Sequence, residues 1–282
     1  MRYKLSAPAT LHTTIQLPAS KSISNRALIL HALAQGHIAP SNLSDCDDTR
    51  VMIKALDGNP GHIDILAAGT AMRFLTAYLS VTPGTRIITG TERMQQRPIR
   101  ILVDALRELG AQIEYAGKEG FPPLRITGTE LTGEEISLAG NVSSQYISAL
   151  LMIGPILKNG LRLNLTGEII SRPYINLTLQ LMKEFGADAA WSSESSITVR
   201  PGKYRDIPFT VESDWSGASY WYQMVALIQD NEKKESTKTE IKLPGLLPRS
   251  YQGDSRGAEI FAKLGVHTTY TDQGVVLTKM GT

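Results

Sequence analysis

The chain has 282 residues, of which 42% are hydrophobic and 20% are charged, and its formal net charge is +2. This length and composition are typical of a globular protein of about two domains, and they exclude a disordered or fibrous chain. The small net charge with scattered basic residues argues against a nucleic-acid-binding protein, and the single cysteine, Cys46, excludes an internal disulfide and favours a reducing compartment.

The first predicted element with a chemical signature is a helix that begins near Lys21. Ser22 or Ser24 is suited to cap it, and residues 27–34 are apolar on almost every side, which predicts a buried helix. Lys21 and Arg26 lie close to its start, where free N–H groups and the helix dipole favour an anion. The residues alone leave two interpretations open: an anion site, or an ordinary capped helix whose two cations face water.

Three further helices are predicted to begin with small polar residues, and their spacing indicates a repeat. Thr70, Ser143 and Ser216 open these helices at intervals of 73 residues. A second marker is a glycine that closes a helix before a strand, and it recurs at Gly110, Gly186 and Gly265. Two markers with nearly the same period indicate several copies of one structural unit.

Short strands are predicted between the helices, where Gly and Pro bound segments that are alternating or rich in β-branched residues. These segments are residues 86–89, 124–127, 161–165 and 197–199. Alternation of helices and strands within a repeat predicts an α/β architecture built from βαβαββ-like units. The charged segment 231–240 is expected to be a solvated loop.

Several helix starts carry groups suited to anions. An arginine precedes a proline at residues 97–98 and again at 172–173. The planar guanidinium of such an arginine can bind a carboxylate or phosphate through two hydrogen bonds, although a salt bridge to a nearby acidic residue explains the arginine equally. Gly69 allows a ligand close to the backbone, and the hydroxyls of Ser143 and Ser144 suit phosphate oxygens, although plain helix caps explain these residues too. Together these groups predict a small ligand with several negative charges.

Other kinds of site find no support in the sequence. The five histidines and one cysteine show no metal-ligand spacing, and neither a Gly-x-Gly-x-x-Gly after a strand nor a Walker loop is present, so neither a metal site nor nucleotide binding through such a loop is expected. No stretch approaches about 18 unbroken apolar residues and the start lacks the apolar core of a signal peptide. We therefore expect a cytoplasmic protein without a membrane span, and a monomer.

The motifs taken together resemble those of the 5-enolpyruvylshikimate-3-phosphate synthase (EPSP synthase) family. The first is PASKSISNRA at residues 18–27, and the others follow in the family's order over nearly the whole chain, at residues 68–73, 93–99, 143–150, 171–174, 211–220 and 252–254. The resemblance implies the enolpyruvyl transferase fold, an inside-out α/β barrel of repeated βαβαββ units in two domains. It implies a complete domain of three repeats at residues 20–212, with residues 1–19 and 213–282 forming part of a second, incomplete domain.

The resemblance also implies a reaction and its substrates. Members of the family transfer the carboxyvinyl group of phosphoenolpyruvate to the 5-hydroxyl of shikimate 3-phosphate and expel phosphate, without a cofactor. Lys21 would then contact both substrates and assist proton transfer, while Ser22 and Arg26 would hold the shikimate carboxylate. Gly69 and Arg97 would hold phosphoenolpyruvate. The remaining implied contacts, with the 3-phosphate and the shikimate ring, are Ser143, Ser144, Gln145 and Ser171.

The sequence departs from the family pattern in two ways. Ala67 and Phe74 stand where many members have Asn and Pro, which would alter affinity for phosphoenolpyruvate or for glyphosate, its competitor in this family. The family also continues beyond Thr282, and its later acid, base and cationic residues have no counterpart here, so we expect no turnover by this chain alone.

Two alternatives stay open beside this interpretation. One is a truncated, non-catalytic homologue that binds shikimate 3-phosphate without chemistry. The other is the related enolpyruvyl transferase that acts on UDP-N-acetylglucosamine. That relative uses a loop cysteine, and Cys46 lies in a different motif.

Overall fold

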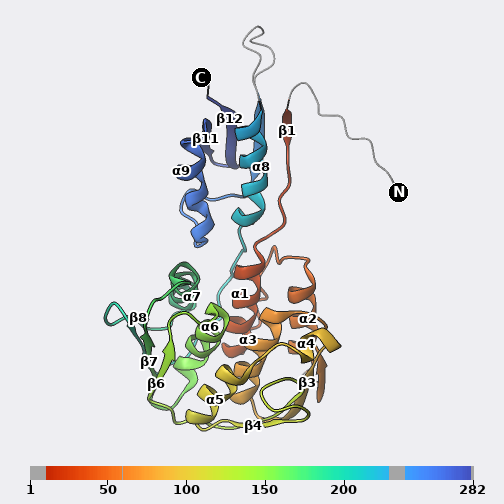
Figure 1. The fold of residues 1–282 in the computed structure, drawn as a ribbon, viewed down its shortest axis with the longest axis vertical. Coiled ribbons are helices and arrows are strands. Elements are labelled where there is room, and N and C mark those ends of the chain that lie inside the picture. The colour runs from red at the N-terminus through yellow and green to blue at the C-terminus, as the bar shows by residue number, and fades with distance from the viewer. Residues whose placement is uncertain (1–10, 59, 229–238, 281–282) are drawn as a thin grey trace. The chain divides into compact units, whose positions relative to one another are not determined.

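The computed structural model describes residues 11–58, 60–228 and 239–280, drawn in colour in Figure 1. The chain divides into two compact units, one formed by Lys21–Val211 and the other by Met1–Ser20 with Glu212–Thr282. The predicted complete domain, residues 20–212, extends one residue beyond the larger unit at each end. Most of the charged segment 231–240, predicted as a loop, lies outside the described residues.

The described residues form three four-stranded sheets with the same topology. In each sheet the first two strands are parallel and the other two pair antiparallel. The first sheet has the order β2 (His62–Asp64), β3 (Gly84–Thr89), β5 (Leu124–Gly128), β4 (Gln112–Tyr115). The second has the order β6 (Glu135–Ala139), β7 (Leu161–Thr166), β9 (Ser196–Val199), β8 (Ala189–Trp191). The third, in the smaller unit, has the order β1 (His12–Thr14), β10 (Glu240–Pro244), β12 (Gly274–Lys279), β11 (Val266–Thr271).

The helices of the larger unit complete two of these repeats and add a further pair. They are α1 (Lys21–Leu33), α2 (Asp47–Leu56), α3 (Gly69–Ser80), α4 (Glu92–Gln95), α5 (Arg100–Glu108), α6 (Ser144–Ile153) with the 3-10 turn η1 (Gly154–Ile156), and α7 (Arg172–Glu184). The order β2-α3-β3-α5-β4-β5 and its copy β6-α6-β7-α7-β8-β9 confirm the predicted βαβαββ unit. Around α1 and α2 the described chain contributes an isolated bridge between Ser41 and Thr210 and no sheet of its own.

The core of the larger unit lies between helices, with the sheets outside them. Figure 1 shows α1, α3 and α6 in the middle of the unit. These three helices contact one another, and α1 and α6 also contact α7. Eight consecutive residues of α1, from Ile23 to Leu30, and eight of α6, from Tyr146 to Ile153, are buried. Helices that are apolar on every side are therefore buried on every side, as the sequence predicts.

The repeated glycines explain how each helix returns to a strand. Gly110, Gly186 and Gly265 follow α5, α7 and α9 (Gly257–Ala262), and their φ angles are 102°, 87° and 80°. This left-handed conformation ends a helix without steric cost only at glycine. The periodic glycine in the sequence is thus the helix stop of each repeat.

The smaller unit has its own core, formed by its helices and the strands of the third sheet. Its helices are α8 (Trp215–Leu227), the 3-10 turn η3 (Gly253–Arg256) and α9. The core includes Trp215, Tyr222, Ile241 and Leu277. Although α8 is mostly apolar, Tyr220, Met224 and Leu227 on this helix are exposed.

Candidate active site

The first turns of four helices in the larger unit are joined by side-chain contacts. The ammonium of Lys21, which begins α1, lies 3.8 Å from Oδ2 of Asp48 on α2. The other oxygen, Oδ1, accepts a hydrogen bond of 3.1 Å from the backbone N–H of Thr70 at the start of α3. Nε2 of Gln145, at the start of α6, lies 3.3 Å from the hydroxyl of Thr70. Helix N-termini that the sequence spaces far apart therefore meet at one place, where their dipoles favour an anion.

Arg97 lies directly beside the first residue of α3. A Cβ built on Gly69 would stand 2.5 Å from Nη1 of Arg97, so the guanidinium occupies the space that glycine leaves open. The Arg97 side chain is exposed and makes no hydrogen bond or ion pair with the residues that the structure describes. Desolvation and the positive charge of Arg73 lower the pKa of Arg97, and Tyr146 and Asp48 partly oppose this shift. Among the described residues Arg97 thus has no side-chain partner, which leaves its guanidinium available to a ligand.

Arg73 is buried and holds the backbone around Gly69 and Arg97 in place. Its guanidinium donates hydrogen bonds to the carbonyl oxygens of Gly69 (3.1 Å) and Pro98 (3.3 Å) and lies 5.7 Å from the centre of the Tyr146 ring. The Tyr146 hydroxyl donates a 2.8 Å hydrogen bond to the same Pro98 carbonyl. These bonds fix the segment that carries Arg97 relative to the start of α3.

Arg93 adds a further cation beside Arg97. The two arginines, with Ala67 and Met94, line a small cavity of about 270 Å³. The two positive charges favour an anionic group such as a phosphate or a carboxylate in this cavity.

Arg26 is buried and bonded to three neighbours. Its side chain is only 3% exposed, and it donates hydrogen bonds to the hydroxyls of Thr178 (2.7 Å) and Ser148 (2.9 Å) and to the carbonyl of Ser22 (2.9 Å). The guanidinium also lies 5.2 Å from the centre of the Phe74 ring. Burial lowers the pKa of Arg26 to about 10. The guanidinium of Arg26 joins α1, α6 and α7, so the interpretation in which Arg26 faces water is wrong, while its contact with the shikimate carboxylate stays a prediction.

The serines at the starts of α6 and α7 divide into two kinds. The hydroxyl of Ser143 caps α6 by accepting a hydrogen bond of 3.3 Å from the backbone N–H of Gln145. Ser144 and Ser171 are partly exposed, and their hydroxyls make no hydrogen bond with the described residues. Arg172, which follows Ser171, donates to the Glu194 carbonyl and stacks 4.3 Å from the Trp191 ring, so its charge serves local packing.

Sequence reasoning missed Asp48, which contacts both Lys21 and α3. The sequence shows only an acidic pair, Asp47 and Asp48, after Cys46. Such a pair is expected at the start of a helix, where it favours the positive end of the dipole. No signal in the sequence indicates that the second carboxylate reaches another helix.

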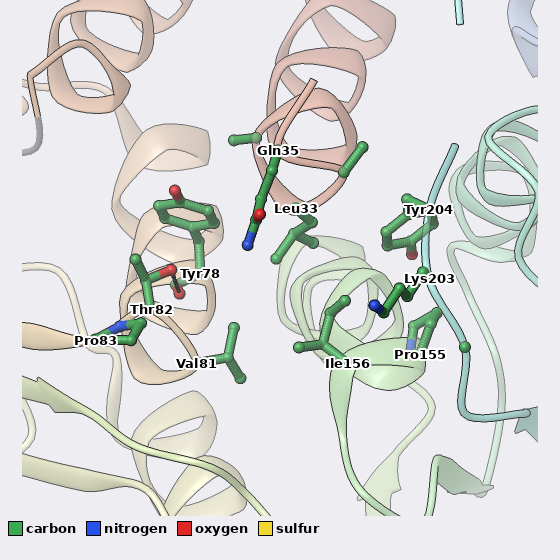
Figure 2. Close-up of a pocket in the computed structure, with 13 residues that line it drawn as sticks. Leu33, Gln35, Tyr78, Val81, Thr82, Pro83, Pro155, Ile156, Lys203 and Tyr204 are labelled. Atoms are coloured by element: carbon green, nitrogen blue, oxygen red, sulfur yellow. Dashed lines mark hydrogen bonds between the residues drawn. The ribbon is translucent and has the colours of Figure 1, made fainter. Parts of the chain in front are cut away.

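A separate cavity of about 470 Å³ lies at the opposite ends of the same helices. Around it Figure 2 shows Leu33 at the end of α1 with Gln35 just beyond, Tyr78 in the last turn of α3 with Thr82 just beyond, and Lys203. None of the predicted site residues lines this cavity. In the part of the chain that the structure describes, no group of three His, Cys, Asp or Glu side chains could hold a metal ion. No helix within the same residues has the length and apolar character needed to cross a membrane.

Comparison with known proteins identifies relatives over the whole described chain. The EPSP synthase (3-phosphoshikimate 1-carboxyvinyltransferase) family matches residues 5–58 and 59–281. A 3-phosphoshikimate 1-carboxyvinyltransferase of Bacteroides fragilis is 71% identical over 282 residues, which are 100% of this chain and 67% of the relative. One from Shewanella halifaxensis is 38% identical over 291 residues and is matched over 66% of its length.

A solved structure of EPSP synthase from Acinetobacter baumannii has the same fold. It superposes with a TM-score of 0.78 at 20% identity and covers 97% of this chain and 65% of that chain. This likeness confirms the predicted enolpyruvyl transferase fold, and the chain spans about two thirds of the length of the relatives that it matches. The family match and the identity to the curated relatives show that this chain belongs to the EPSP synthase family, the 3-phosphoshikimate 1-carboxyvinyltransferases.

Proposed function

We propose that this chain carries the shikimate 3-phosphate site of an EPSP synthase. In the complete enzyme the carboxyvinyl group of phosphoenolpyruvate passes to the 5-hydroxyl of shikimate 3-phosphate, and phosphate leaves. The single observation that carries the proposal is the chain of contacts from Lys21 to Asp48, from Asp48 to Thr70 and from Thr70 to Gln145. These contacts gather four helix starts and the half-exposed Lys21 ammonium at one place. Both substrates are small polyanions, and such a place favours them.

We assign the 3-phosphate to the starts of α6 and α7. The hydroxyls of Ser144 and Ser171 are free to donate within the described residues, and Ser143 fixes the first turn of α6 beside them. Backbone N–H groups in that turn add further donors. Gln145 follows Ser144 and contacts Thr70 of α3, and from this position it would lie against the shikimate ring.

We assign phosphoenolpyruvate to Gly69 and Arg97. The guanidinium of Arg97 has free N–H donors over the backbone of Gly69, so a carboxylate or phosphate there would bond both groups. Lys21 would stand between the two substrates, where its ammonium can stabilise developing negative charge and assist proton transfer.

The shikimate carboxylate is assigned to Ser22 with Arg26 behind it. Arg26 bonds the carbonyl of Ser22 and has two of its five N–H groups uncommitted to the described residues. A buried cation next to an accessible hydroxyl attracts a carboxylate more strongly than it would in water, because less solvent screens it.

For the whole protein we propose two domains, a monomeric state and a cytoplasmic location. Residues 20–212 would be the first domain, and residues 1–19 with 213–282 would belong to the second. Support comes from the division of the chain into two compact units and from the fold of the solved relatives. A single cysteine, Cys46, fits a reducing compartment.

Calorimetric titration with shikimate 3-phosphate tests the proposal directly. The native chain is expected to bind it, and Ser144→Ala is expected to weaken binding about tenfold or more, since a hydrogen bond to a charged group is lost. Ser137→Ala is the matched control, because Ser137 is exposed on β6 and takes no part in the site. Absence of binding by the native chain, or equal losses in the two variants, would contradict the assignment.

The same titration separates the alternatives. Binding of UDP-N-acetylglucosamine in place of shikimate 3-phosphate would favour the related transferase. Shikimate 3-phosphate binding with no phosphate release from phosphoenolpyruvate, even in a full-length relative carrying these 282 residues, would favour a non-catalytic binding protein.

A further inference from the structure

Asp48 places a carboxylate among the cations of the proposed substrate site. Its side chain is 18% exposed, and its two oxygens face different partners: Oδ1 the backbone N–H of Thr70 at 3.1 Å, and Oδ2 the ammonium of Lys21 at 3.8 Å. Asp48 also opposes the lowering of the pKa of Arg97. The carboxylate therefore occupies a position where an anionic ligand would otherwise gain the same contacts.

The neighbours of Asp48 hold this carboxylate in place. The hydroxyl of Thr49, the next residue, donates a buried 2.8 Å hydrogen bond to Oδ1 of Asn25 on α1. Shortly before α2, the backbone N–H of Ser44 donates a buried 2.9 Å hydrogen bond to the hydroxyl of Ser24. Two buried bonds to α1 fix the start of α2, so the position of Asp48 relative to Lys21 is set by the core.

Helix α3 depends on Asp48 for its N-terminal cap. Ala68, the residue before α3, provides no side-chain hydrogen bond, and the first turn of α3 contains no acidic residue. A helix start without a cap of its own leaves N–H groups and positive partial charge unsatisfied. Asp48 supplies both the acceptor and the negative charge from a neighbouring helix.

We propose that Asp48 is a positioning residue of this enzyme, which fixes the Lys21 ammonium relative to the start of α3. Its negative charge also competes with an incoming anionic group for contacts with the Lys21 ammonium and with the Thr70 N–H. The inference rests on the proposed function, because it treats Lys21 and α3 as substrate contacts. A permanent counter-ion keeps the cations in place before substrate arrives. It also limits affinity for simple anions such as phosphate, the reaction product.

Asp48→Asn separates the charge of this residue from its shape. The amide oxygen can still accept the hydrogen bond from Thr70, while the attraction to Lys21 is removed. Titration with inorganic phosphate should then show binding at least about fivefold tighter than in the native chain, the factor for one unit-charge interaction at 4 Å in water. Asp47→Asn is the matched control: it removes the same charge from the adjacent, exposed residue and should change phosphate affinity less than twofold.

Three further readouts distinguish an electrostatic role from a merely structural one. The gain in phosphate affinity should shrink at high salt, since screening weakens charge interactions. It should also largely disappear when Lys21→Met is combined with Asp48→Asn, whereas Asp48→Glu should restore native affinity. Loss of the cap alone would produce none of these dependences.

The inference is overturned if phosphate affinity changes equally in Asp48→Asn and Asp47→Asn, or if neither the native chain nor Asp48→Asn binds phosphate. Shikimate 3-phosphate binding is measured on the same samples, so the two proposals fail separately. A chain that binds shikimate 3-phosphate but shows equal phosphate affinities in both variants contradicts the role of Asp48 and leaves the function standing. A chain that shows the phosphate effect without binding shikimate 3-phosphate supports the role of Asp48 and contradicts the function.

Discussion

The guanidinium of Arg97 packs against the α-carbon of Gly69 so closely that any larger residue at position 69 must displace it. A Cβ there would stand 2.5 Å from Nη1 and 2.9 Å from Nη2. These atoms form the far end of a flexible side chain, so the displacement costs little folding energy. It does move the one arginine of the proposed phosphoenolpyruvate site away from the backbone N–H groups of α3.

Gly69→Ala should therefore lower anion affinity and leave the fold intact. We expect about a tenfold loss in phosphoenolpyruvate affinity, the loss typical of one charge-assisted hydrogen bond, and a change in the free energy of unfolding below about 1 kcal/mol. Calorimetry and urea denaturation measure the two quantities. Unchanged affinity would show that Arg97 does not bind the ligand from this position.

Gly128→Ala provides the contrasting case for Gly69→Ala. A Cβ on Gly128 would collide with the carbonyl oxygen of Thr82, which is backbone and cannot swing aside. We expect this variant to lose about 1–3 kcal/mol of stability, as overpacked sites do. Similar stabilities for the two alanine variants would contradict the difference between side-chain and backbone neighbours.

Arg26→Lys should destabilise the larger unit although it keeps the charge. The guanidinium bonds Thr178, Ser148 and the Ser22 carbonyl in a buried setting, and an ammonium cannot reach all three. We expect a loss of about 2–3 kcal/mol in the free energy of unfolding. Urea denaturation measures it, with Arg125→Lys on the exposed face of β5 as the control. Equal stabilities would show that the Arg26 bonds do not contribute to folding.

Glu212 should make stability depend on pH. This carboxyl is buried, and its desolvation raises its pKa above the ordinary value of 4.5, although hydrogen bonds from Ser250 and Gln252 oppose the shift. The folded state thus binds the proton more tightly than the unfolded state, so this contribution to stability is complete below pH 4.5 and is lost as pH rises through the raised pKa.

Glu212→Gln should remove this pH dependence. Thermal unfolding of the variant is expected to match the native chain in acid and to occur at higher temperature near neutrality, because no charge has to be buried. Glu259→Gln, on the exposed surface of α9, should change neither curve. A neutral-pH gain that persists unchanged in acid would point to a cause other than the ionisation of Glu212.

The exposed stripe of α8 should bind apolar molecules. Tyr220, Met224 and Leu227 are 67%, 46% and 73% exposed, and their spacing of four and three residues places them on one side of the helix. Contiguous apolar surface of this kind is unusual in a folded protein. Combining Met224→Lys with Leu227→Lys should lower the fluorescence of the neutral dye Nile red, at unchanged melting temperature.

Ile101→Lys on α5 is the control for the dye experiment, since Ile101 is 43% exposed and belongs to the larger unit, whereas α8 belongs to the smaller one. It should leave dye fluorescence near the native value. If the two variants reduce fluorescence equally, the dye does not report on the α8 stripe.

Local patterns in the sequence determined the repeat and its elements. The glycines at 110, 186 and 265 required left-handed backbone, and all three helices end there. The all-round apolar runs of α1 and α6 required burial, and both helices lie in the core. These features depend on neighbours within about ten residues, where backbone conformation and hydrophobic period are set.

Only the tertiary structure decided where the charged side chains point. Arg26 meets Thr178 across 152 residues, Gln145 meets Thr70 across 75, and Asp48 meets Thr70 across 22. No period or spacing in the sequence specifies these pairs, because each depends on how whole helices pack against one another. The sequence by itself therefore determined which groups could bind an anion. Packing of the helices decided that Lys21 and Gln145 share one place with Asp48, while the Arg26 side chain is turned into the core.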